Sequence, residues 1–495
     1  MNRREASSLN ASRVLVLVPS SEQAANVPRD LVYGCWCAGK RIGGINFPPL
    51  TSVLIATILR EQGIDADFRD LAGEGRPMEA LDPVMGNYAA LVLLTSTMTI
   101  NEDARVLEHF KGLNPRLLNI VWGSHPTFLP RQTLSRPGID VAVRGEGDYI
   151  IRDVVRRHLA GEEWRSTPGI AYRTGEEVVV NSPYPFINNL DELPFPDRSL
   201  LSARAVYFNP VVKRTPYTTL YTTRGCPARC TFCTVPSFYG GKIRMRRAEN
   251  VLEELRLVAA QGYREVFIRD EIFTADRRRL LQIARGMIEE ELDLTWICSA
   301  RVGTIDEEMM QLMKESGCHM IRVGVESGVQ SILDRAKKGI TVRQTEELLD
   351  LAHRYNIEIH AHMMLGMPGE TRETIEETLR FVKKIKPAVV TFGICTPYPG
   401  TALFEEVSRA HPDILDGSAC NLAKLHQQGF FNSAFCSLSE EDLGICLRKA
   451  YRSFYLQPRF LLSRLRSLRS REGWKRNIKA GLKVLSFSLE RPGKS

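Results

Sequence analysis

The chain has 495 residues, of which 43% are hydrophobic and 25% are charged, and its formal net charge is +8. This length suits about two to four domains with sizeable cores, and no stretch approaches the roughly 18 consecutive apolar residues of a membrane span. The 11 cysteines are odd in number and scattered, which argues against a disulfide framework. The first apolar run, residues 14–18, is too short for the core of a signal peptide. We therefore expect a cytoplasmic protein with reduced thiols.

Apolar runs alternate with amphipathic segments over residues 14–160. Strands are expected at residues 13–20, 64–71, 89–96, 116–125 and 139–148. Helices are expected at residues 48–63, 101–115 and 149–161. This alternation predicts a doubly wound, Rossmann-like parallel sheet, whose ligands bind at the carboxyl ends of the strands. The rim expected at those ends consists of Thr95, Ser96, Thr97, Gly123, His125, Gly145 and Glu146.

A second alternation begins beyond a hairpin expected at 168–180 and a Pro-rich linker. Its six strand-like runs lie at residues 217–223, 264–270, 292–300, 319–327, 357–366 and 388–397. A helical stretch follows each of the first five runs, which predicts a partial (β/α)6 barrel with its chemistry at the carboxyl ends of the strands. We divide the chain into a Rossmann-like domain, a linker, the barrel and a helical basic region, at residues 1–180, 181–214, 215–425 and 426–495.

Three cysteines follow the first barrel strand in the stretch RGCPARCTFCTVP, with the spacing C-x3-C-x2-C: Cys226, Cys230 and Cys233. A structural zinc site normally takes four protein ligands, usually from two separated pairs, and no second pair stands at suitable spacing. Closely spaced thiolates are typical of iron–sulfur ligation. Three ligands for a four-iron cluster leave one iron open to a substrate or cofactor.

The C-x3-C-x-aromatic-C motif after the first strand of a partial barrel, with Phe232 as the aromatic residue, resembles the radical S-adenosylmethionine superfamily. The resemblance covers about residues 215–425. It implies a [4Fe–4S] cluster on the three cysteines, with the amino and carboxylate groups of S-adenosylmethionine on the fourth iron. It also implies a 5′-deoxyadenosyl radical, formed with one electron from a reductant such as flavodoxin or ferredoxin.

The same resemblance implies cofactor contacts at the ends of later strands. In IRDEIFT, Asp270 and Glu271 are candidates for the cofactor's amino group, and Arg301 in CSAR can pair with a carboxylate. In RVGVESG and MMLGMPGET, the candidates for ribose and for the adenine side are Glu326, Ser327, Gly366 and Pro368. For each single residue the alternative is a strand-to-helix turn with its cap.

The order of a doubly wound domain, a Pro-rich linker and a radical barrel resembles the cobalamin-binding class of this superfamily. The matching stretches are PPL at 48–50, GSHPTFLP at 123–130 and RGEGD at 144–148. The resemblance implies a cobalamin bound by the N-terminal domain. The D-x-H-x-x-G motif, which supplies a histidine to cobalt in other cobalamin domains, is absent. On the expected rim, His125 is the only histidine, and its alternative role is that of a loop residue bonded to the backbone.

The function implied is hydrogen abstraction from an unactivated carbon, followed by methylation from methylcobalamin. Two alternatives stay open: a radical cyclase, oxidase or rearrangement enzyme resembling the anaerobic cyclase of Mg-protoporphyrin ester, and an iron–sulfur electron carrier. Residues 459–488 hold 9 Lys/Arg and 1 Glu with apolar residues at helical spacing. Such a helix suits an anionic membrane surface and a lipid or other apolar substrate, or else it packs on the barrel. We expect no nucleic-acid partner, because no recognition fold accompanies the charge.

Overall fold

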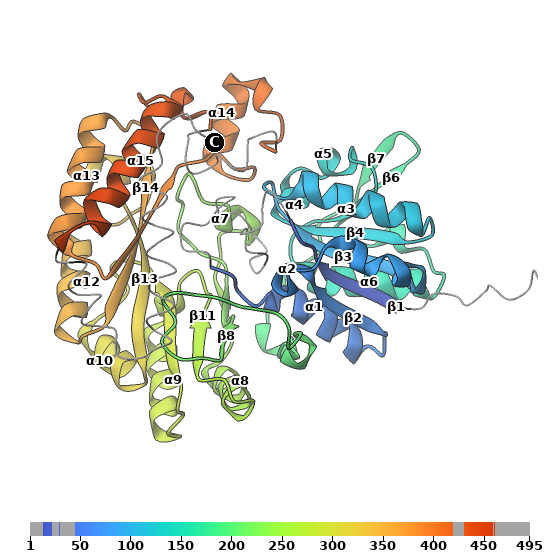
Figure 1. Ribbon diagram of the computed structural model, residues 1–495, viewed down its shortest axis with the longest axis horizontal. Coiled ribbons are helices and arrows are strands. Elements are labelled where there is room, and N and C mark those ends of the chain that lie inside the picture. Colours follow the sequence, from blue (N-terminus) through green and yellow to red (C-terminus); the bar gives the residue numbers. More distant parts are fainter. Residues whose placement is uncertain (1–12, 22–28, 30–44, 419–429, 459, 461–495) are drawn as a thin grey trace, which may run out of the picture. The chain divides into compact units, whose positions relative to one another are not determined.

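The computed structural model describes residues 13–21, 29, 45–418, 430–458 and 460. The chain forms two compact units (Figure 1). The N-terminal unit contains Met1–Trp36, Pro48–Ile187 and Leu193–Tyr207, and the barrel unit contains Cys37–Phe47, Asn188–Glu192 and Phe208–Ser495. The segment expected as a linker, 181–214, is therefore divided between the two units.

The N-terminal unit is built on one seven-stranded sheet with the order β2-β1-β3-β4-β5-β6-β7. The first five strands are parallel, as the alternating pattern predicts, and an antiparallel hairpin extends the sheet at β5. The strands are β1 (Arg13–Val18), β2 (Ala66–Asp70), β3 (Tyr88–Thr95), β4 (Leu118–Gly123), β5 (Val141–Val143), β6 (Ile170–Thr174) and β7 (Glu177–Val180).

Helices cover both faces of this sheet, which confirms the doubly wound arrangement. Successive side chains of a strand point to opposite faces, and Leu15, Leu17, Leu91 and Leu93 all pack in the cluster that includes Phe110 of α3. The helical elements are α1 (Leu50–Glu61), α2 (Leu71–Glu74), the 3-10 helix η1 (Met78–Asn87), α3 (Ile100–Leu113), α4 (Ser124–Phe128), α5 (Pro130–Leu134) and α6 (Gly147–Leu159).

The barrel unit contains the six predicted parallel strands, each paired with the next in chain order. They are β8 (Tyr217–Leu220), β11 (Glu265–Ile268), β12 (Thr295–Ala300), β13 (Cys318–Glu326), β14 (Glu358–Leu365) and β15 (Val389–Ile394). In this sheet β8 and β15 are the two edges, so the barrel is partial. A short ribbon of β9 (Thr223–Arg224) and β10 (Arg244–Met245) follows the first strand.

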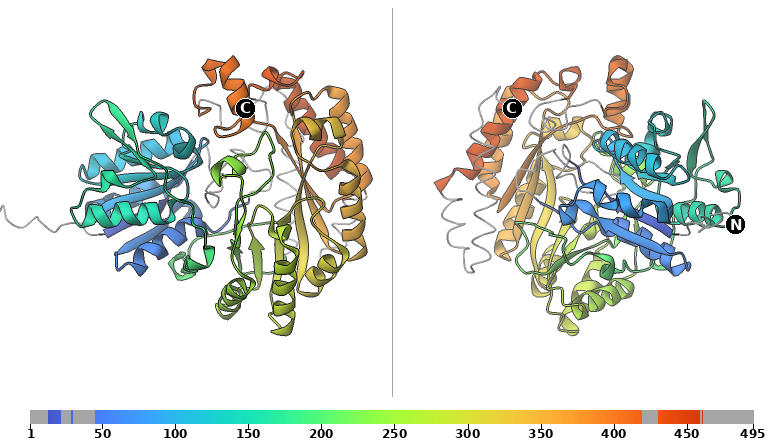
Figure 2. Two further views of the ribbon diagram at one scale, coloured as in Figure 1. Left: turned by 180° about the vertical axis from the view of Figure 1, so that it is seen from behind. Right: turned by 45° about the vertical axis from the view of Figure 1, so that its right-hand side comes forward.

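Helices follow the outer face of the barrel sheet (Figures 1 and 2). Several begin at a side-chain cap directly after a strand-end loop, as Asp276, Asp306, Thr341 and Thr371 each accept a hydrogen bond from the first turn. The helices are α7 (Val235–Phe238), α8 (Ala248–Ala260), α9 (Arg277–Glu289), α10 (Glu307–Glu315), α11 (Gln330–Arg335), α12 (Val342–Arg354), α13 (Arg372–Ile385), α14 (Ala402–Ala410) and α15 (Glu440–Tyr455).

Helix α15 covers the edge strand β15. Tyr451 donates to the carbonyl oxygen of Phe392 (3.0 Å), and Tyr455 donates to that of Val390 (2.6 Å). These bonds satisfy main-chain groups that an exposed edge would leave open. The basic helix expected at 459–488 lies outside the described residues, apart from Phe460. None of the helices that the structure describes is both long and apolar enough to cross a bilayer.

Candidate functional site

The three cysteines lie on the loop between β9 and α7, and all three are free and partly buried. The backbone fixes this loop on two sides, because Thr231 N donates to Ala336 O and Leu403 N donates to Thr231 O, each at 3.0 Å. Phe232 is buried in an apolar cluster that includes Cys230 and Cys233 as partly buried neighbours. The aromatic residue of the motif thus anchors the loop that carries the thiols.

The cysteine loop suits a cubane cluster better than a single ion. Among the described residues, no three His, Cys, Asp or Glu side chains converge on one metal position. A cubane does not require such convergence, because each thiolate binds a different iron. Burial raises the pKa of the Cys226 thiol, and the charge of Arg301 opposes this shift. Burial also raises the pKa of the Cys233 thiol to about 12, and the charge of Lys338 opposes that shift. Bound iron would favour the thiolate forms that ligation requires.

Asp270 and Glu271, at the end of β11, occupy different positions relative to this loop. The buried Asp270 accepts from Thr222 N (2.6 Å), Thr223 N (3.1 Å) and the Thr222 hydroxyl, so its carboxylate fixes the turn that leads into the cysteine loop. Glu271 accepts from the backbone of Gly225, the residue before Cys226, and burial raises its pKa to about 8. Its Oε2 atom is buried without a hydrogen-bond partner among the described residues.

Glu326, at the end of β13, also has one carboxylate oxygen that is buried without a hydrogen-bond partner among the described residues. Its Oε1 atom accepts from Lys338 Nζ at 2.6 Å, and its Oε2 atom is buried with no partner in the described part of the chain. The backbone of Glu326 has φ = 64°, a left-handed conformation that is unfavourable for a residue with a side chain. A Cβ atom on Gly324 would collide with the Glu326 carboxylate, so this glycine leaves the space that the carboxylate fills.

Arg301 and Ser327, two further barrel candidates, have different surroundings. Arg301 donates to the carbonyl oxygen of Lys338, and its charge acts on Cys226, so it lies beside the cysteine loop. Ser327 is fully buried and is engaged with the Thr378 hydroxyl (3.0 Å) and with Val329 N (3.2 Å). Its hydroxyl therefore organises the turn after β13.

The turn after β14 contains Gly366 and Pro368. Gly366 has φ = 73°, and a Cβ atom there would crowd Asn432. Asn432 is fully buried and donates to the carbonyl oxygens of Gly366 (3.0 Å) and Cys395 (2.9 Å), tying the ends of β14 and β15 together. Glu370 folds back to accept from Met367 N at 3.0 Å, and burial raises its pKa to about 7.

Sequence reasoning missed three of these residues. Lys338 lies in a loop, Glu370 lies within the stretch MMLGMPGET, and Asn432 begins the 3-10 helix η7 (Asn432–Ala434). None of the three was singled out from the sequence, because their contacts depend on the path of the chain. The glycine-rich stretch around Gly366 was the only signal near Glu370.

The rim of the N-terminal unit begins at the end of β3, beside the point between β1 and β3 where the parallel order 2-1-3-4-5 reverses. Ligands of open parallel sheets bind at such switch points, beyond the carboxyl ends of the strands. The register of β3 and β4 brings two predicted rim residues together, because Thr95 is the partner of Gly123. Gly123 has φ = 120°, and a Cβ atom there would collide with the Thr95 carbonyl oxygen.

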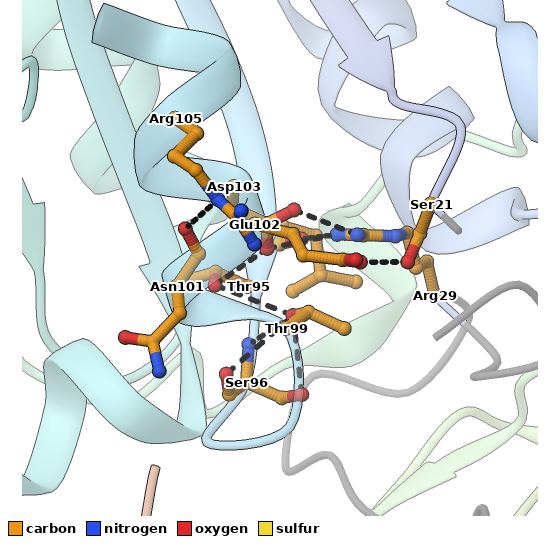
Figure 3. Close-up of polar contacts among 10 residues, drawn as sticks. Ser21, Arg29, Thr95, Ser96, Thr99, Asn101, Glu102, Asp103 and Arg105 are labelled. Atoms are coloured by element: carbon orange, nitrogen blue, oxygen red, sulfur yellow. Dashed lines mark hydrogen bonds and ion pairs between the residues drawn. The ribbon is translucent and has the colours of Figure 1, made fainter. Parts of the chain in front are cut away.

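A buried ion pair supports the end of β3 (Figure 3). Asp103 of α3 binds Arg29 through both oxygens, at 2.6 and 3.0 Å, and accepts from the Thr95 hydroxyl at 2.7 Å. Arg29 also donates to Leu94 O at 2.9 Å. Ser96 N donates to Thr99 Oγ1 at 3.1 Å, which closes the turn into α3. The polar groups of Thr95 and Ser96 therefore hold the rim in shape.

The loops after β4 and β5 complete this rim. His125 is fully buried, and its Nδ1 atom lies 3.1 Å from the Thr97 hydroxyl. Gly145 N donates to Thr127 Oγ1 at 2.9 Å, and a Cβ atom on Gly145 would face open space. The Glu146 carboxylate accepts from Ile187 N at 2.9 Å. Thus Thr97 and His125 come together, whereas Glu146 secures a distant backbone segment.

The loop after β4 offers a polar atom suited to a bound group. The Ser124 hydroxyl is buried without a hydrogen-bond partner among the described residues, next to His125 at the end of β4. Open space beside Gly145 is also compatible with a large ligand. These features fit a bound cobalamin.

Comparison with known proteins agrees with both units. The radical SAM superfamily model matches residues 220–382, and the B12 binding domain model matches residues 44–155. An uncharacterized methyltransferase of Pyrococcus horikoshii, PH0819, is 30% identical over 463 residues, which are 92% of this chain and 95% of the relative. The chain belongs to the B12-binding radical SAM enzymes.

Two further likenesses place this B12-binding radical SAM enzyme among its relatives. The anaerobic magnesium-protoporphyrin IX monomethyl ester cyclase of Cereibacter sphaeroides is 28% identical over 398 residues, covering 77% of this chain and 64% of the cyclase. The solved structure of the cobalamin-dependent S-adenosylmethionine radical enzyme OxsB shares the fold, with a TM-score of 0.68 at 17% identity over 96% of this chain and 72% of OxsB.

Family membership confirms the cofactors expected from the sequence, namely a [4Fe–4S] cluster, S-adenosylmethionine and cobalamin. Enzymes of this kind act on small molecules and need a reductant.

Proposed function

We propose that this B12-binding radical SAM enzyme methylates an unactivated carbon of a lipid or other apolar small molecule. The observation that carries the proposal is a pair of buried carboxylate oxygens, on Glu271 and Glu326, that have no hydrogen-bond partner among the described residues. Together the cluster, S-adenosylmethionine and cobalamin supply a hydrogen-abstracting radical and a transferable methyl group. The methyltransferase relative that spans 92% of the chain supports methyl transfer as the outcome.

The residues around the cysteine loop divide the work of holding S-adenosylmethionine. Glu271 suits the ammonium group, because its free oxygen can accept from a cation while Gly225 N fixes the carboxylate. The free oxygen of Glu326 suits a ribose hydroxyl, and Arg301 suits the methionine carboxylate. Asp270 acts as a positioning residue, since backbone and hydroxyl donors of Thr222 and Thr223 already use its carboxylate.

The rim of the N-terminal unit would hold cobalamin. Ser124 offers a hydroxyl without a partner among the described residues, and Gly145 leaves room for the corrin or its side chains. Thr95, Ser96, Gly123 and Glu146 would act indirectly, by fixing the loops that carry these groups.

A product assay tests the proposal against its alternatives. The full chain, reconstituted anaerobically with cluster and hydroxocobalamin and reduced by flavodoxin, is incubated with S-adenosylmethionine and candidate apolar substrates. Methylation yields 5′-deoxyadenosine together with S-adenosylhomocysteine. The first product alone would point to the cyclase-like alternative, which the Cereibacter relative favours. Neither product would point to an electron carrier and would refute the proposal.

Membrane delivery of the substrate is a separable part of the proposal. It rests on the basic, amphipathic pattern of residues 459–488, each basic residue contributing about 1 kcal/mol near an anionic surface. Sedimentation with vesicles should show binding that needs anionic lipid, weakens with salt and is lost when the chain stops at Gln457. Equal binding by the truncated chain would exclude the tail as the contact.

A further inference from the structure

The interior face of the barrel carries a group of basic and aromatic side chains. Alternate residues of a strand point to opposite faces, and Ile268, Val323, Ala361 and Met363 pack in the core cluster shared with the outer helices. The residues between them therefore face the interior. They include Phe267 within β11 and Arg269 directly after it, Arg322 on β13, and His360 and His362 on β14.

These side chains form two sets, which meet where Arg322 of β13 and His360 of β14 are register partners. The Phe267 ring lies between two guanidinium groups, at 5.2 Å from Arg269 and 5.2 Å from Arg322. Arg269 also lies 4.2 Å from the ring of Phe47, which belongs to the barrel unit and packs edge-on against Phe267. The imidazoles of His360 and His362 stack at 4.4 Å.

Several basic side chains act on His362. Burial lowers its pKa well below the usual value, and Arg322, His360, Lys338 and Arg269 lower it further. The His362 Nε2 atom is buried with no hydrogen-bond partner in the described part of the chain.

Two carboxylates on the same strands are already engaged elsewhere. Glu265 bonds to His319 at 2.9 Å, and Glu326 bonds to Lys338 at 2.6 Å. A bound anion would accept hydrogen bonds from the His362 ring and from the neighbouring guanidinium groups.

We propose that the barrel interior binds an oxyanion of the substrate, a carboxylate or a phosphoryl group, through His362, Arg322 and Arg269. Phe267 and Phe47 would contact the apolar part of the same molecule. The planar fork of an arginine binds such oxyanions with two hydrogen bonds. Lys338 connects this site with the cofactor site, because it bonds Glu326 and its charge acts on both Cys233 and His362.

The inference rests on the proposed function and narrows its substrate class. The apolar substrate is expected to carry an anionic group and not to be a pure hydrocarbon. Binding can be measured without turnover, by calorimetry of the anaerobically reconstituted full chain with three probes of similar length, hexyl phosphate, heptanoate and 1-hexanol. Each charge-assisted bond that the alcohol lacks should strengthen anion binding by about tenfold or more. Preference for one anion over the other identifies the oxyanion.

Matched variants locate the site. Arg322→Met and His362→Gln should each weaken anion binding by about tenfold and leave hexanol binding unchanged. Arg343→Met serves as the control, because this arginine is 87% exposed on α12. If R322M fails to fold, Arg322→Lys retains the charge without the fork and should show a smaller loss. Equal affinity for the three probes, no binding of either anion, or unchanged affinity in the folded variants overturns the proposal.

The same preparations separate this inference from the proposed function. Formation of 5′-deoxyadenosine and S-adenosylhomocysteine is measured independently of probe binding. Anion binding without methyl transfer would refute the proposed function alone, and methyl transfer without anion preference would refute the oxyanion site alone.

Discussion

The ion pair between Arg29 and Asp103 allows a quantitative test of what stabilises the rim of the N-terminal unit. Asp103→Leu removes both contacts to the guanidinium and leaves it 6% exposed, with Leu94 O as a remaining acceptor. Breaking a buried pair by removing one partner costs about 3–5 kcal/mol, because the other charge is left uncompensated. The Thr95 hydroxyl also loses its acceptor at 2.7 Å, which costs about 1 kcal/mol.

The double variant Arg29→Met/Asp103→Leu should be far less destabilised than either single variant. Its buried charges are both gone, so only the Thr95 term of about 1 kcal/mol remains. Arg29→Met alone should cost about 3 kcal/mol, since the Asp103 carboxylate is then buried with Thr95 as its donor. The single costs of about 4–6 and 3 kcal/mol, less about 1 kcal/mol for the double variant, predict a coupling energy of roughly 6 kcal/mol or more.

The full chain is unfolded with denaturant, and hydrogen exchange is followed in peptides from β3 and α3. These peptides report the stability of the N-terminal unit separately from that of the barrel. The reasoning is refuted if the double variant loses as much stability as the sum of the single variants. It is also refuted if Asp103→Leu costs no more than about 1 kcal/mol, the value for an ordinary lost hydrogen bond.

Three further predictions concern the cofactors and the barrel. Single alanine replacements in the cysteine loop should abolish the brown chromophore and 5′-deoxyadenosine formation, whereas Cys318→Ala should retain both; a fully active loop variant would contradict the ligand set Cys226, Cys230 and Cys233. His125→Ala should leave the visible spectrum of bound hydroxocobalamin unchanged, because the chain lacks the D-x-H-x-x-G motif that supplies a histidine to cobalt; a band shift would indicate cobalt ligation. Glu370, with its pKa raised to about 7, binds more protons folded than unfolded between pH 4.5 and 7. As the pH rises from 4.5 to 7, the free energy of unfolding of the wild type should therefore fall by about 3 kcal/mol more than that of Glu370→Gln. Parallel pH profiles of the two proteins would exclude this.

The sequence predicted the strands and helices well where apolar periodicity is strong. All six barrel strands were expected within a few residues of their observed bounds, as for β14, because both faces of a parallel strand are buried. Strand order was not predictable in the N-terminal unit, since β1 pairs with both β2 and β3 through contacts far apart in the chain. The short helices α2 and η1 were also missed, because residues 71–87 combine glycine and proline with no clear period.

The site was predictable to the extent that spacing defines it. The three cysteines share one loop, so their motif was sufficient to find them. Asp270 shows the limit: its place at a strand end was predicted, but its hydrogen bonds depend on where the N–H groups of Thr222 and Thr223 lie after the neighbouring strand β8. Lys338 shows the same limit, because its bond to Glu326 depends on the path of the chain after α11.

Polar residues near the strand ends of both units differ in whether their oxygens already accept hydrogen bonds from the protein. Asp103 and Asp270 have carboxylates that accept from several protein donors, and each fixes the shape of a loop. Glu326 and Ser124 retain a buried oxygen without a partner among the described residues, which costs about 1–3 kcal/mol each in the absence of a ligand. Glu326 adds a left-handed backbone conformation to that cost. Costs of this kind persist where the surrounding structure enforces them for a purpose, so these oxygens are the ones that a bound cofactor would satisfy.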